Sequence, residues 1–376
     1  MKRRDFLKAS AILLLPLPGC SLAPTKRSGR GLAVLPSFNR GNLSLYDWDR
    51  RTVEEFAMPM DLTHSALHNP ATNELILFEN IGPTCSVFDL STRKIRKTLR
   101  RNDGWLFYGH GALSPGGHRL VCTEFALDFY STSPGKLTVR DPSSLEILSE
   151  LPSHGYHPHD LCFLDEDTIA VTNHGSGPAN KSNVSFISYK TGALLGRTEF
   201  DQPNGNFGHL IAYGKDRVFA SSVIGEVPDT EESRRWKKLR HEKAMAAKAM
   251  RKLQELTQYK PSPLFVAGRD AASALWDEQH PEDFRNAFSL CRVSGELYAS
   301  AHAASDAVAV WRHGRLERTL RFPGLMPSAV AASSDGAELA VGSANGRIVF
   351  LSTKDFTEIP GTALKLASGP VHILTV

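Results

Sequence analysis

The chain of 376 residues contains only five cysteines, too few to build a scaffold held together by disulfides. None of them forms a C-x-x-C pair, and no C-x-x-C-H motif occurs, so we expect no haem attached in that way. Four cysteines lie beyond the first twenty residues: Cys85, Cys122, Cys162 and Cys291. Sequence alone leaves three pairings open, and single buried thiols in strands are the simpler expectation.

Long apolar runs and nucleotide-binding motifs are also missing. No apolar run reaches the roughly 18 residues that a membrane-spanning helix needs, which excludes a multispan membrane protein. The sequence has no P-loop, no dinucleotide glycine fingerprint and no G-x-S-x-G elbow, so no nucleotide cofactor is expected. A net charge of +4 is too small to indicate nucleic-acid binding. Hydrophobic residues make up 41%, enough for a large core.

Residues 1–20 have the features of an export signal. Arg3 to Lys8 resembles the twin-arginine pattern R-R-x-F-L-K at every position, and a short apolar stretch follows from Ala9 to Leu17. Leu17 to Cys20 resembles a lipobox, in which Cys20 would be lipidated and become the mature N-terminus. The alternative is an ordinary signal peptide cleaved near Cys20. We therefore expect twin-arginine export to the periplasm, with Cys20 anchoring a lipoprotein to the membrane.

A repeated segment follows the leader. Its form is a strand of alternating apolar and polar residues that often ends in aspartate before a polar turn, as half-buried strands do. Seven stretches fit it: Asn42–Asp47, Cys85–Asp89, Lys136–Asp141, Asn183–Ser188, Pro263–Ala267, Asp306–Trp311 and Gly346–Leu351. All but the first are preceded by a hairpin of two short apolar strands, so the unit has about four strands.

The spacing of these hairpins predicts a β-propeller. Their starts are 46, 49, 50, 77 and 42 residues apart, with a seventh start 44 residues later at His372. Propeller blades repeat at about 40–50 residues, and the 77-residue gap holds one blade plus an insertion. The last strand should complete the first blade, which opens at Gly31. We predict an all-β, seven-bladed β-propeller over residues 31–376, closed by its C-terminal strand.

Histidine dominates one position of the repeat, the residue that opens the first strand of each blade beside the channel mouth. The seven opening residues are His64, His110, His159, His209, Asn286, Ser328 and His372. Histidine is 14 of 376 residues, so five of seven is far above its share. Imidazoles from several blades that point at one axis would form a cage for a transition-metal ion.

Carboxylates stand at the end of the returning hairpin strand, at the same end of the sheet. Glu79 and Glu124 follow their histidines by 15 and 14 residues. We consider them candidate ligands, or partners that orient the imidazoles. Such a set suits iron, zinc, copper or manganese, with iron and copper favoured here. The alternative is structural: Gly109-His110 and Gly208-His209 resemble the Gly-His pairs that hydrogen bond between strands of WD repeats.

Residues 229–260 form the insertion, between the second and third strands of one blade. They lack glycine and proline and hold ten basic against five acidic residues. Apolar residues recur at helical spacing, so we predict a basic amphipathic helical segment. It could cover the channel, dock a partner or touch anionic lipid, or simply pack on a neighbouring blade.

Three motifs resemble those of an uncharacterised family of twin-arginine-exported bacterial propeller proteins. They are Phe107–Gly117, Ser153–Leu161 and Gly208–Leu210. The resemblance covers most of residues 31–376 and places His64, His110, His159 and His209 on the family's histidine positions. It implies a setting in iron acquisition, beside an imelysin-type lipoprotein and a di-haem peroxidase-like protein as partners. The insertion and Asn173-His174-Gly175 depart from the family pattern.

Three functions remain open from the sequence. The first is a metal-binding propeller of the cell envelope that serves iron acquisition, with His64, His110, His159, His209 and His372 as ligands. The second is a non-enzymatic interaction scaffold, in which these histidines are structural and the basic helix recruits partners. The third is a metal-dependent oxidoreductase with an open coordination position.

Overall fold

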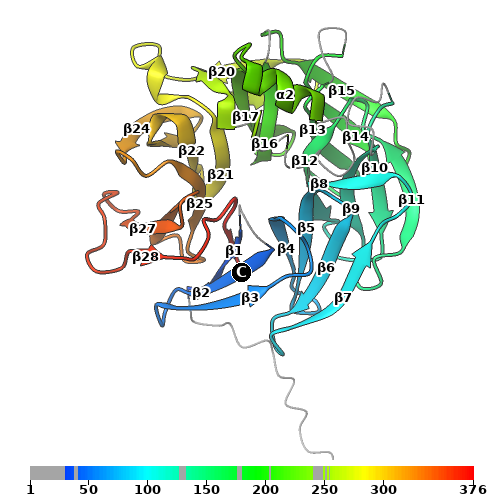
Figure 1. Ribbon diagram of the computed structural model, residues 1–376, viewed down its shortest axis with the longest axis horizontal. Coiled ribbons are helices and arrows are strands. Elements are labelled where there is room, and N and C mark those ends of the chain that lie inside the picture. The colour runs from blue at the N-terminus through cyan, green and yellow to red at the C-terminus, as the bar shows by residue number, and fades with distance from the viewer. Residues whose placement is uncertain are drawn as a thin grey trace, which may run out of the picture.

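Strands dominate the computed structural model of the chain, which describes residues 30–37, 41–126, 133–175, 180–202, 205–239, 249, 252–253 and 255–376. Antiparallel sheets are arranged radially around a common axis, and their innermost strands face that axis (Figure 1). This is the arrangement of a β-propeller, as the sequence predicted. The leader, residues 1–20 with Cys20, lies outside the described residues.

The sheets follow chain order, from the axis outwards. Three four-stranded groups come from the first half of the described chain: β4 (Thr63–Asn69), β5 (Glu74–Gly82), β6 (Thr84–Asp89) and β7 (Lys94–Arg100); β8 (Trp105–Leu113), β9 (Leu120–Ala126), β10 (Lys136–Arg140) and β11 (Ile147–Pro152); and β12 (Pro158–Phe163), β13 (Thr168–Asn173), β14 (Asn183–Ser188) and β15 (Leu194–Glu199). The first two of these groups are joined into one sheet because β5 also pairs with β8.

Three further groups follow the same order. They are β16 (Gly205–Tyr213), β17 (Arg217–Glu226), β19 (Leu264–Ala267) and β20 (Ala272–Leu275); β21 (Ala287–Ser294), β22 (Leu297–His302), β23 (Ala307–Arg312) and β24 (Arg315–Arg321); and β25 (Pro327–Ala332), β26 (Glu338–Ser343), β27 (Arg347–Ser352) and β28 (Leu364–Lys365). Each group is a meander of antiparallel neighbours. Such meanders need only short turns, which the repeated polar segments supply.

The two ends of the described chain meet in one sheet. Its strands run in the order β29 (Leu374–Thr375), β1 (Leu32–Pro36), β2 (Asn42–Asp47) and β3 (Thr52–Ala57). The Leu32 N–H donates to the Val376 carbonyl at 2.9 Å, and the Val376 N–H donates back to Leu32 at 2.9 Å. The C-terminal strand therefore lies at the axis beside the N-terminal strands, which is the pairing predicted for these segments.

Aspartate ends several of the third strands for a local reason. The carboxylates of Asp47, Asp89 and Asp141 each accept the backbone N–H groups of the residues two and three positions further along the chain. Asp89, for example, accepts from Ser91 at 2.7 Å and from Thr92 at 3.1 Å. These bonds hold the pKa of the Asp89 carboxyl below its usual value. The side chain thus replaces the missing strand partner and turns the chain into the outer strand.

Apolar side chains pack between neighbouring sheets to form the core. Leu43 and Leu45 of β2 pack in one cluster with Leu75 and Leu77 of β5 and with Phe88 of β6, and each is at most 1% exposed. Similar clusters lie between the other pairs of neighbouring sheets. Apolar residues therefore line both faces of the inner strands, with single buried polar residues such as Ser86, Thr138 and Ser185 between them.

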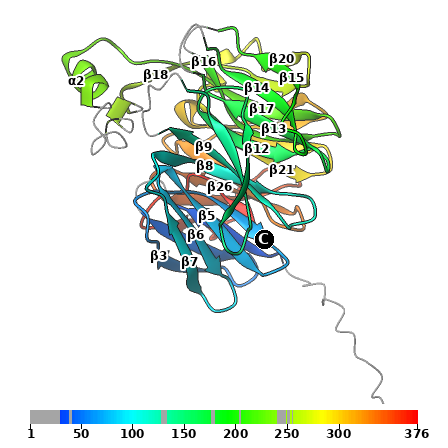
Figure 2. The same ribbon diagram turned by 90° about the vertical axis from the view of Figure 1, so that its right-hand side faces the viewer.

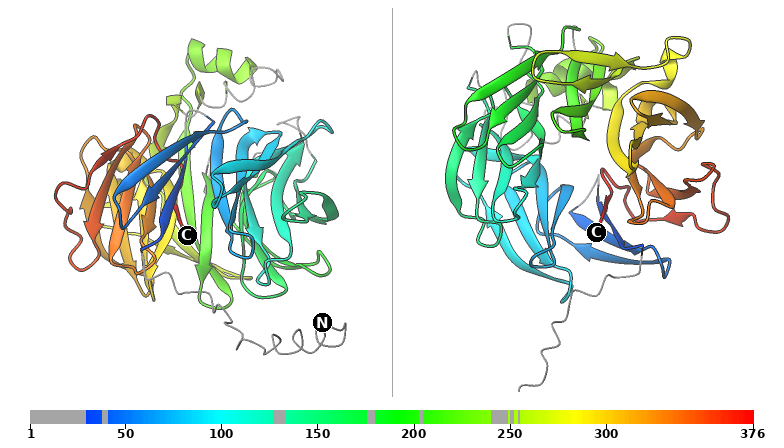
Figure 3. Two further views of the ribbon diagram at one scale, coloured as in Figure 1. Left: turned by 90° about the horizontal axis from the view of Figure 1, so that it is seen from below. Right: turned by 180° about the vertical axis from the view of Figure 1, so that it is seen from behind.

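The basic insertion leaves the propeller at the end of β17. Residue Ile224 near that end pairs with Gly205 at the start of β16, so the insertion lies at the same end of the sheet as His209. Helix α2 (Glu231–Leu239) stands away from the sheets in two views (Figures 2 and 3). Residues 258–260, included in the predicted helical segment, instead form β18 (Gln258–Lys260), which pairs with Gly225 and its neighbours and lengthens the hairpin.

The four described cysteines form no disulfide with one another. Cys85, Cys122, Cys162 and Cys291 are free thiols, as the simpler expectation had it. Burial raises the pKa of the Cys122 thiol to about 12, so it is an unreactive core group. None of the described helices has both the length and the apolar composition required to cross a bilayer.

The junction of the two chain ends can be tested at Gly31. Its φ is +84°, and a Cβ atom there would lie 2.4 Å from the Val376 carbonyl oxygen. Gly104 has the same φ of +84° but no atom within 4 Å of such a Cβ. Both Gly→Ala changes carry a backbone cost of about 1–2 kcal/mol. We expect Gly31→Ala to lose about 1–3 kcal/mol more because of the clash.

Urea unfolding of the two variants measures this difference. Equal losses of unfolding free energy in Gly31→Ala and Gly104→Ala would contradict the contact between Gly31 and the C-terminal carbonyl.

Candidate metal centre

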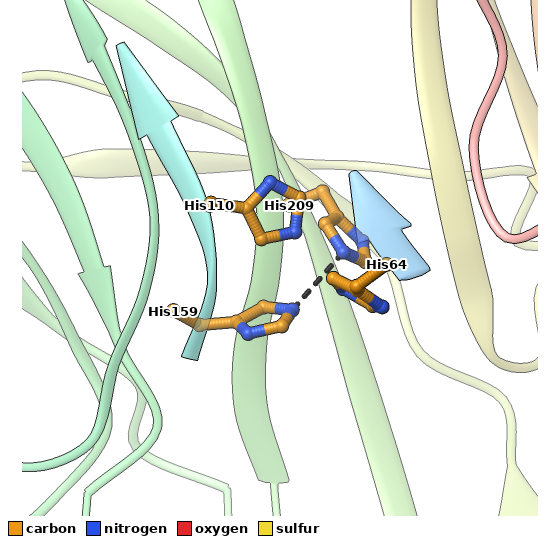
Figure 4. A group of neighbouring side chains, drawn as sticks. All are labelled: His64, His110, His159 and His209. Atoms are coloured by element: carbon orange, nitrogen blue, oxygen red, sulfur yellow. Dashed lines mark hydrogen bonds between the residues drawn. The ribbon is translucent and has the colours of Figure 1, made fainter. Parts of the chain in front are cut away.

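Each of the six innermost strands that open a hairpin contains a bulge close to its start. In β4, for example, Thr63 pairs with Glu79 and Ser65 pairs with Phe78, so His64 has no opposite residue. In the other five strands the bulge skips one to three residues of the hairpin register. The skipped residues include His110, His159, His209, Phe288 and Ser328. A bulge adds a residue that the ladder does not pair and redirects its side chain. Here it brings four imidazoles together (Figure 4).

The predicted register was wrong at one of these positions. Asn286 was expected to open its blade, but the bulged residue is Phe288, two positions later. The centre of the Phe288 ring lies 6.1 Å from that of His209. An apolar residue therefore stands where four other blades place histidine. Ser328 occupies the equivalent place in β25, as predicted.

Five imidazoles pack against one another at this point. The ring centre of His209 lies 4.4 Å from that of His372 and 4.8 Å from that of His159, and the His64 ring lies 4.8 Å from His110. His372 precedes β29 and reaches the same cluster. The structure therefore brings together all five histidines that the sequence singled out.

Four of these side chains have the geometry of a metal cage. His64, His110, His159 and His209 are 3–8% exposed. One ligand nitrogen from each lies within 4.8 Å of the other three. The Nε2 atoms of His159 and His209 are 3.0 Å apart and face each other. Two nitrogens on one tetrahedral ion would be about 3.3 Å apart for bonds near 2.05 Å, which is close to the separation seen.

Neighbouring groups orient two of the rings and leave their Nε2 atoms directed inwards. The Nδ1 atom of His159 lies 3.2 Å from the Tyr108 carbonyl oxygen, to which it can donate. The Nδ1 atom of His110 lies 3.2 Å from a carboxylate oxygen of Asp160. The hydrogen bond to Tyr108 selects the tautomer of His159 whose Nε2 carries a lone pair, and the Asp160 carboxylate lies beside Nδ1 of His110.

Several of the remaining ring nitrogens are buried without a hydrogen-bond partner. Within the described residues of the five-imidazole cluster this holds for the Nε2 atoms of His64, His110 and His372 and for Nδ1 of His209. A buried polar atom without a partner costs about 1–3 kcal/mol, and here four such atoms share one site. These unsatisfied nitrogens are what an absent ligand would be expected to leave.

Burial also keeps the imidazoles neutral. It lowers the pKa values of His64, His110, His159 and His209 well below the usual value of 6.5, and the neighbouring histidines lower them further. For His372 burial lowers the pKa to about 3. The neutral form is the one that binds metal ions, so the cluster is in its ligating state at neutral pH.

Glu79 lies at the predicted end of the sheet, but it has other partners. One carboxylate oxygen accepts the Asp61 N–H at 3.0 Å, and the other accepts the Thr84 N–H at 2.9 Å. It therefore ties two backbone turns to the end of β5. It is not a member of the four-histidine group.

Glu124 likewise has other partners, because it forms ion pairs with two arginines. It is 0% exposed, accepts from Arg140 at 2.7 Å and from Thr138 at 2.6 Å, and also pairs with Arg101. This network of buried charges joins the second and third strands of its blade. The structure thus gives both predicted carboxylates a role in holding loops rather than a contact with the imidazoles.

Asp160 is the carboxylate that touches the cluster, and sequence reasoning did not single it out. It follows His159 in β12, and burial raises its pKa to about 7. His174, noted in the sequence only as part of a departure from the family pattern, has its ring centre 4.5 Å from that of His159. Its Nδ1 atom lies 3.2 Å from the Tyr108 hydroxyl. Only the His-Asp dipeptide of β12 could have drawn attention to Asp160.

A protein-family profile described as "Protein of unknown function (DUF1513)" matches residues 59–267, more than half of the chain. The chain belongs to this family. The DUF1513 segment contains His64, His110, His159 and His209, whereas His372 lies outside it. No curated protein is similar enough in sequence to be matched.

Solved structures with the same fold differ widely in sequence from this DUF1513 member. The Rrp9 WD40 repeats align with a TM-score of 0.59 at 12% identity, over 90% of this chain and 88% of theirs. Kuenenia stuttgartiensis hydrazine synthase gives 0.59 at 12% identity, over 87% and 90%. Dihydro-haem d1 dehydrogenase NirN gives 0.57 at 11% identity, over 90% and 74%. At these identities the likeness establishes a propeller fold and no function.

The position of Glu124 predicts that its loss is structural. We expect Glu124→Gln to lower the free energy of unfolding by about 3–5 kcal/mol, because Arg101 and Arg140 lose the charge that compensates them. Glu150→Gln, at an exposed partner of Lys136, is the control and should cost under about 1 kcal/mol. Urea unfolding measures both, and a Glu124→Gln loss as small as the control's would contradict the buried network.

The buried imidazoles also predict how the stability of the metal-free protein depends on pH. Seven histidines have lowered pKa values: His64, His110, His159, His174, His209, His302 and His372. Below about pH 6.5 the unfolded chain takes up protons that the folded chain excludes, so stability falls as pH decreases. Asp160 works in the opposite direction between its usual pKa and about 7, but it is one group against seven.

We therefore expect the urea midpoint of the metal-free protein to drop steeply between pH 7 and pH 5. Each fully excluded proton contributes about 1.4 kcal/mol per pH unit. His118, on the surface, supplies a control: His118→Ala should keep the full pH slope, whereas His209→Ala should reduce it. A midpoint that stays constant down to pH 5 would mean that the cluster is protonated in the folded protein.

Proposed function

We propose that this protein binds a transition-metal ion at His64, His110, His159 and His209. One observation carries the proposal: four buried, neutral imidazoles from four successive four-stranded groups place a ligand nitrogen each within 4.8 Å of the others. A purely structural cluster would be expected to satisfy its nitrogens with hydrogen bonds. The partnerless Nε2 atoms of His64 and His110 favour a ligand instead.

The chemistry of the donors fits a first-row transition metal. Imidazole suits iron, copper, zinc and nickel, whereas magnesium and calcium prefer oxygen ligands. His64, His110, His159 and His209 would hold the ion, and His372 is the candidate fifth ligand. We favour iron or copper as the ion. A metal bound there would supply Lewis acidity or a redox couple, and the residues supply binding and orientation.

The cell envelope is the proposed setting. The twin-arginine pattern at Arg3 and Arg4 and the lipobox ending at Cys20 support export and anchoring in the periplasm. The family resemblance supports a role in iron acquisition, with an imelysin-type lipoprotein and a di-haem peroxidase-like protein as candidate partners. The metal would then be either a resident ion or the cargo itself.

We also infer that the ring consists of seven blades and is closed by β29. Seven groups of four successive strands can be drawn from the sheets of the described residues, and the pairing of Leu374 with Val34 supports closure within the first blade. Such a closure would place His372 opposite His64 and His209, where its ring is found. The position of the fifth histidine and the closure of the ring therefore depend on the same short segment.

Elemental analysis by mass spectrometry of natively exported protein tests the proposal. We expect near-stoichiometric metal in the wild type and loss of that metal in a His110→Ala, His159→Ala, His209→Ala triple variant. The matched control replaces three exposed histidines, His118, His280 and His313, with alanine and should keep the metal. Absence of metal from the wild type, even after titration with iron, copper and zinc, would overturn the metal function and leave the scaffold.

A further inference from the structure

We propose that Asp160 is the positioning residue of the metal cage: its carboxylate holds His110 in its ligating orientation and links the strands that carry three of the four ligands. The inference rests on the proposed metal binding and adds a residue that acts through His110 rather than on the ion. It is derived from three contacts of one buried side chain on β12.

The first two contacts fix the carboxylate to the backbone. One oxygen of Asp160 accepts the N–H of Leu161 at 2.8 Å, and the other accepts the N–H of Leu210 at 3.0 Å. Leu210 directly follows His209 in β16, and Asp160 directly follows His159 in β12. The side chain therefore joins two neighbouring innermost strands at the point where each presents its imidazole.

The third contact reaches a ligand from the strand on the other side. The oxygen that accepts from Leu161 also lies 3.2 Å from Nδ1 of His110, which belongs to β8. A proton on that Nδ1 leaves Nε2 with its lone pair, and Nε2 is buried without a partner in the described part of the chain. One carboxylate thus accepts hydrogen bonds from the backbone of β12 and β16 and lies within reach of a proton on Nδ1 of His110 in β8.

The electrostatic surroundings of Asp160 also support a role beside a bound cation. Its side chain is 13% exposed, and within the described residues the one basic side chain within 4 Å of its carboxylate is the neutral imidazole of His110. No arginine or lysine compensates it there, in contrast to Glu124 with its two arginines. A cation held by Nε2 of His110 would draw the Nδ1 proton towards the carboxylate and strengthen that bond. The position thus costs desolvation that a bound cation offsets.

Cobalt(II) chloride is the probe, because its visible absorption reports the ligand field and a chelator competition gives its affinity. We expect Asp160→Asn to weaken cobalt binding about 10–100-fold and to shift the absorption bands of the remaining complex. Asp165→Asn is the control. Asp165 lies in the turn between β12 and β13, where it accepts the N–H groups of Asp167 and Thr168, and its loss should change neither quantity.

A double-mutant cycle shows whether Asp160 acts through His110. In a His110→Ala background the further change Asp160→Asn should cost little additional affinity. A full additional loss would overturn the positioning role. Asp160→Ser, whose hydroxyl can still accept one backbone N–H, replaces Asp160→Asn if circular dichroism shows that the latter does not fold.

The outcomes separate this inference from the function on which it rests. Wild-type protein that binds no cobalt contradicts the metal function itself. Wild-type protein that binds cobalt while Asp160→Asn binds it with the same affinity and spectrum leaves the function intact and overturns the role of Asp160.

Discussion

The bulge at the start of each innermost strand is the constraint on which the site depends. A regular antiparallel ladder alternates its side chains between the two faces of a sheet, and both faces here are buried against neighbouring sheets. An unpaired residue breaks this alternation and allows a side chain to point along neither face. Repetition of the bulge around the axis makes four such side chains converge. Histidine at that position in successive sheets then suffices to form a cage.

Much of this was predictable from the sequence because it repeats. The period of the hairpins indicated a propeller, and the aspartates that end the third strands coincide with turns that their side chains stabilise. The five histidines came from the same register. Asn286 was wrong: β21 has a second register shift, between Arg292 and Ser294, which no periodicity reveals, and its bulged residue is Phe288. Asp160 was missed because its importance depends on His110 and Leu210, which belong to other blades.

Two kinds of buried carboxylate lie near the channel mouth, and only their partners distinguish them. Glu79 and Glu124 stand at the ends of second strands and hold loops through backbone N–H groups or arginines. Asp160 stands on a first strand and has an imidazole as its ionisable partner among the described residues. Spacing along the chain placed the glutamates close to the histidines, but a residue at the end of the second strand points into the blade. Distance in sequence therefore identified the end of the sheet, while the partners of both glutamates are backbone N–H groups, a hydroxyl and arginines.

The position of His372 has a consequence for the order of synthesis. The four histidines from His64 to His209 belong to four successive four-stranded groups, and His372 follows His209 by 163 residues in the chain. During translation the four-histidine group therefore leaves the ribosome long before the imidazole that packs against it from the other side. Until that segment pairs with β1, the four-histidine group lacks the imidazole of His372. The pairing of β29 with β1 therefore completes the five-imidazole cluster last.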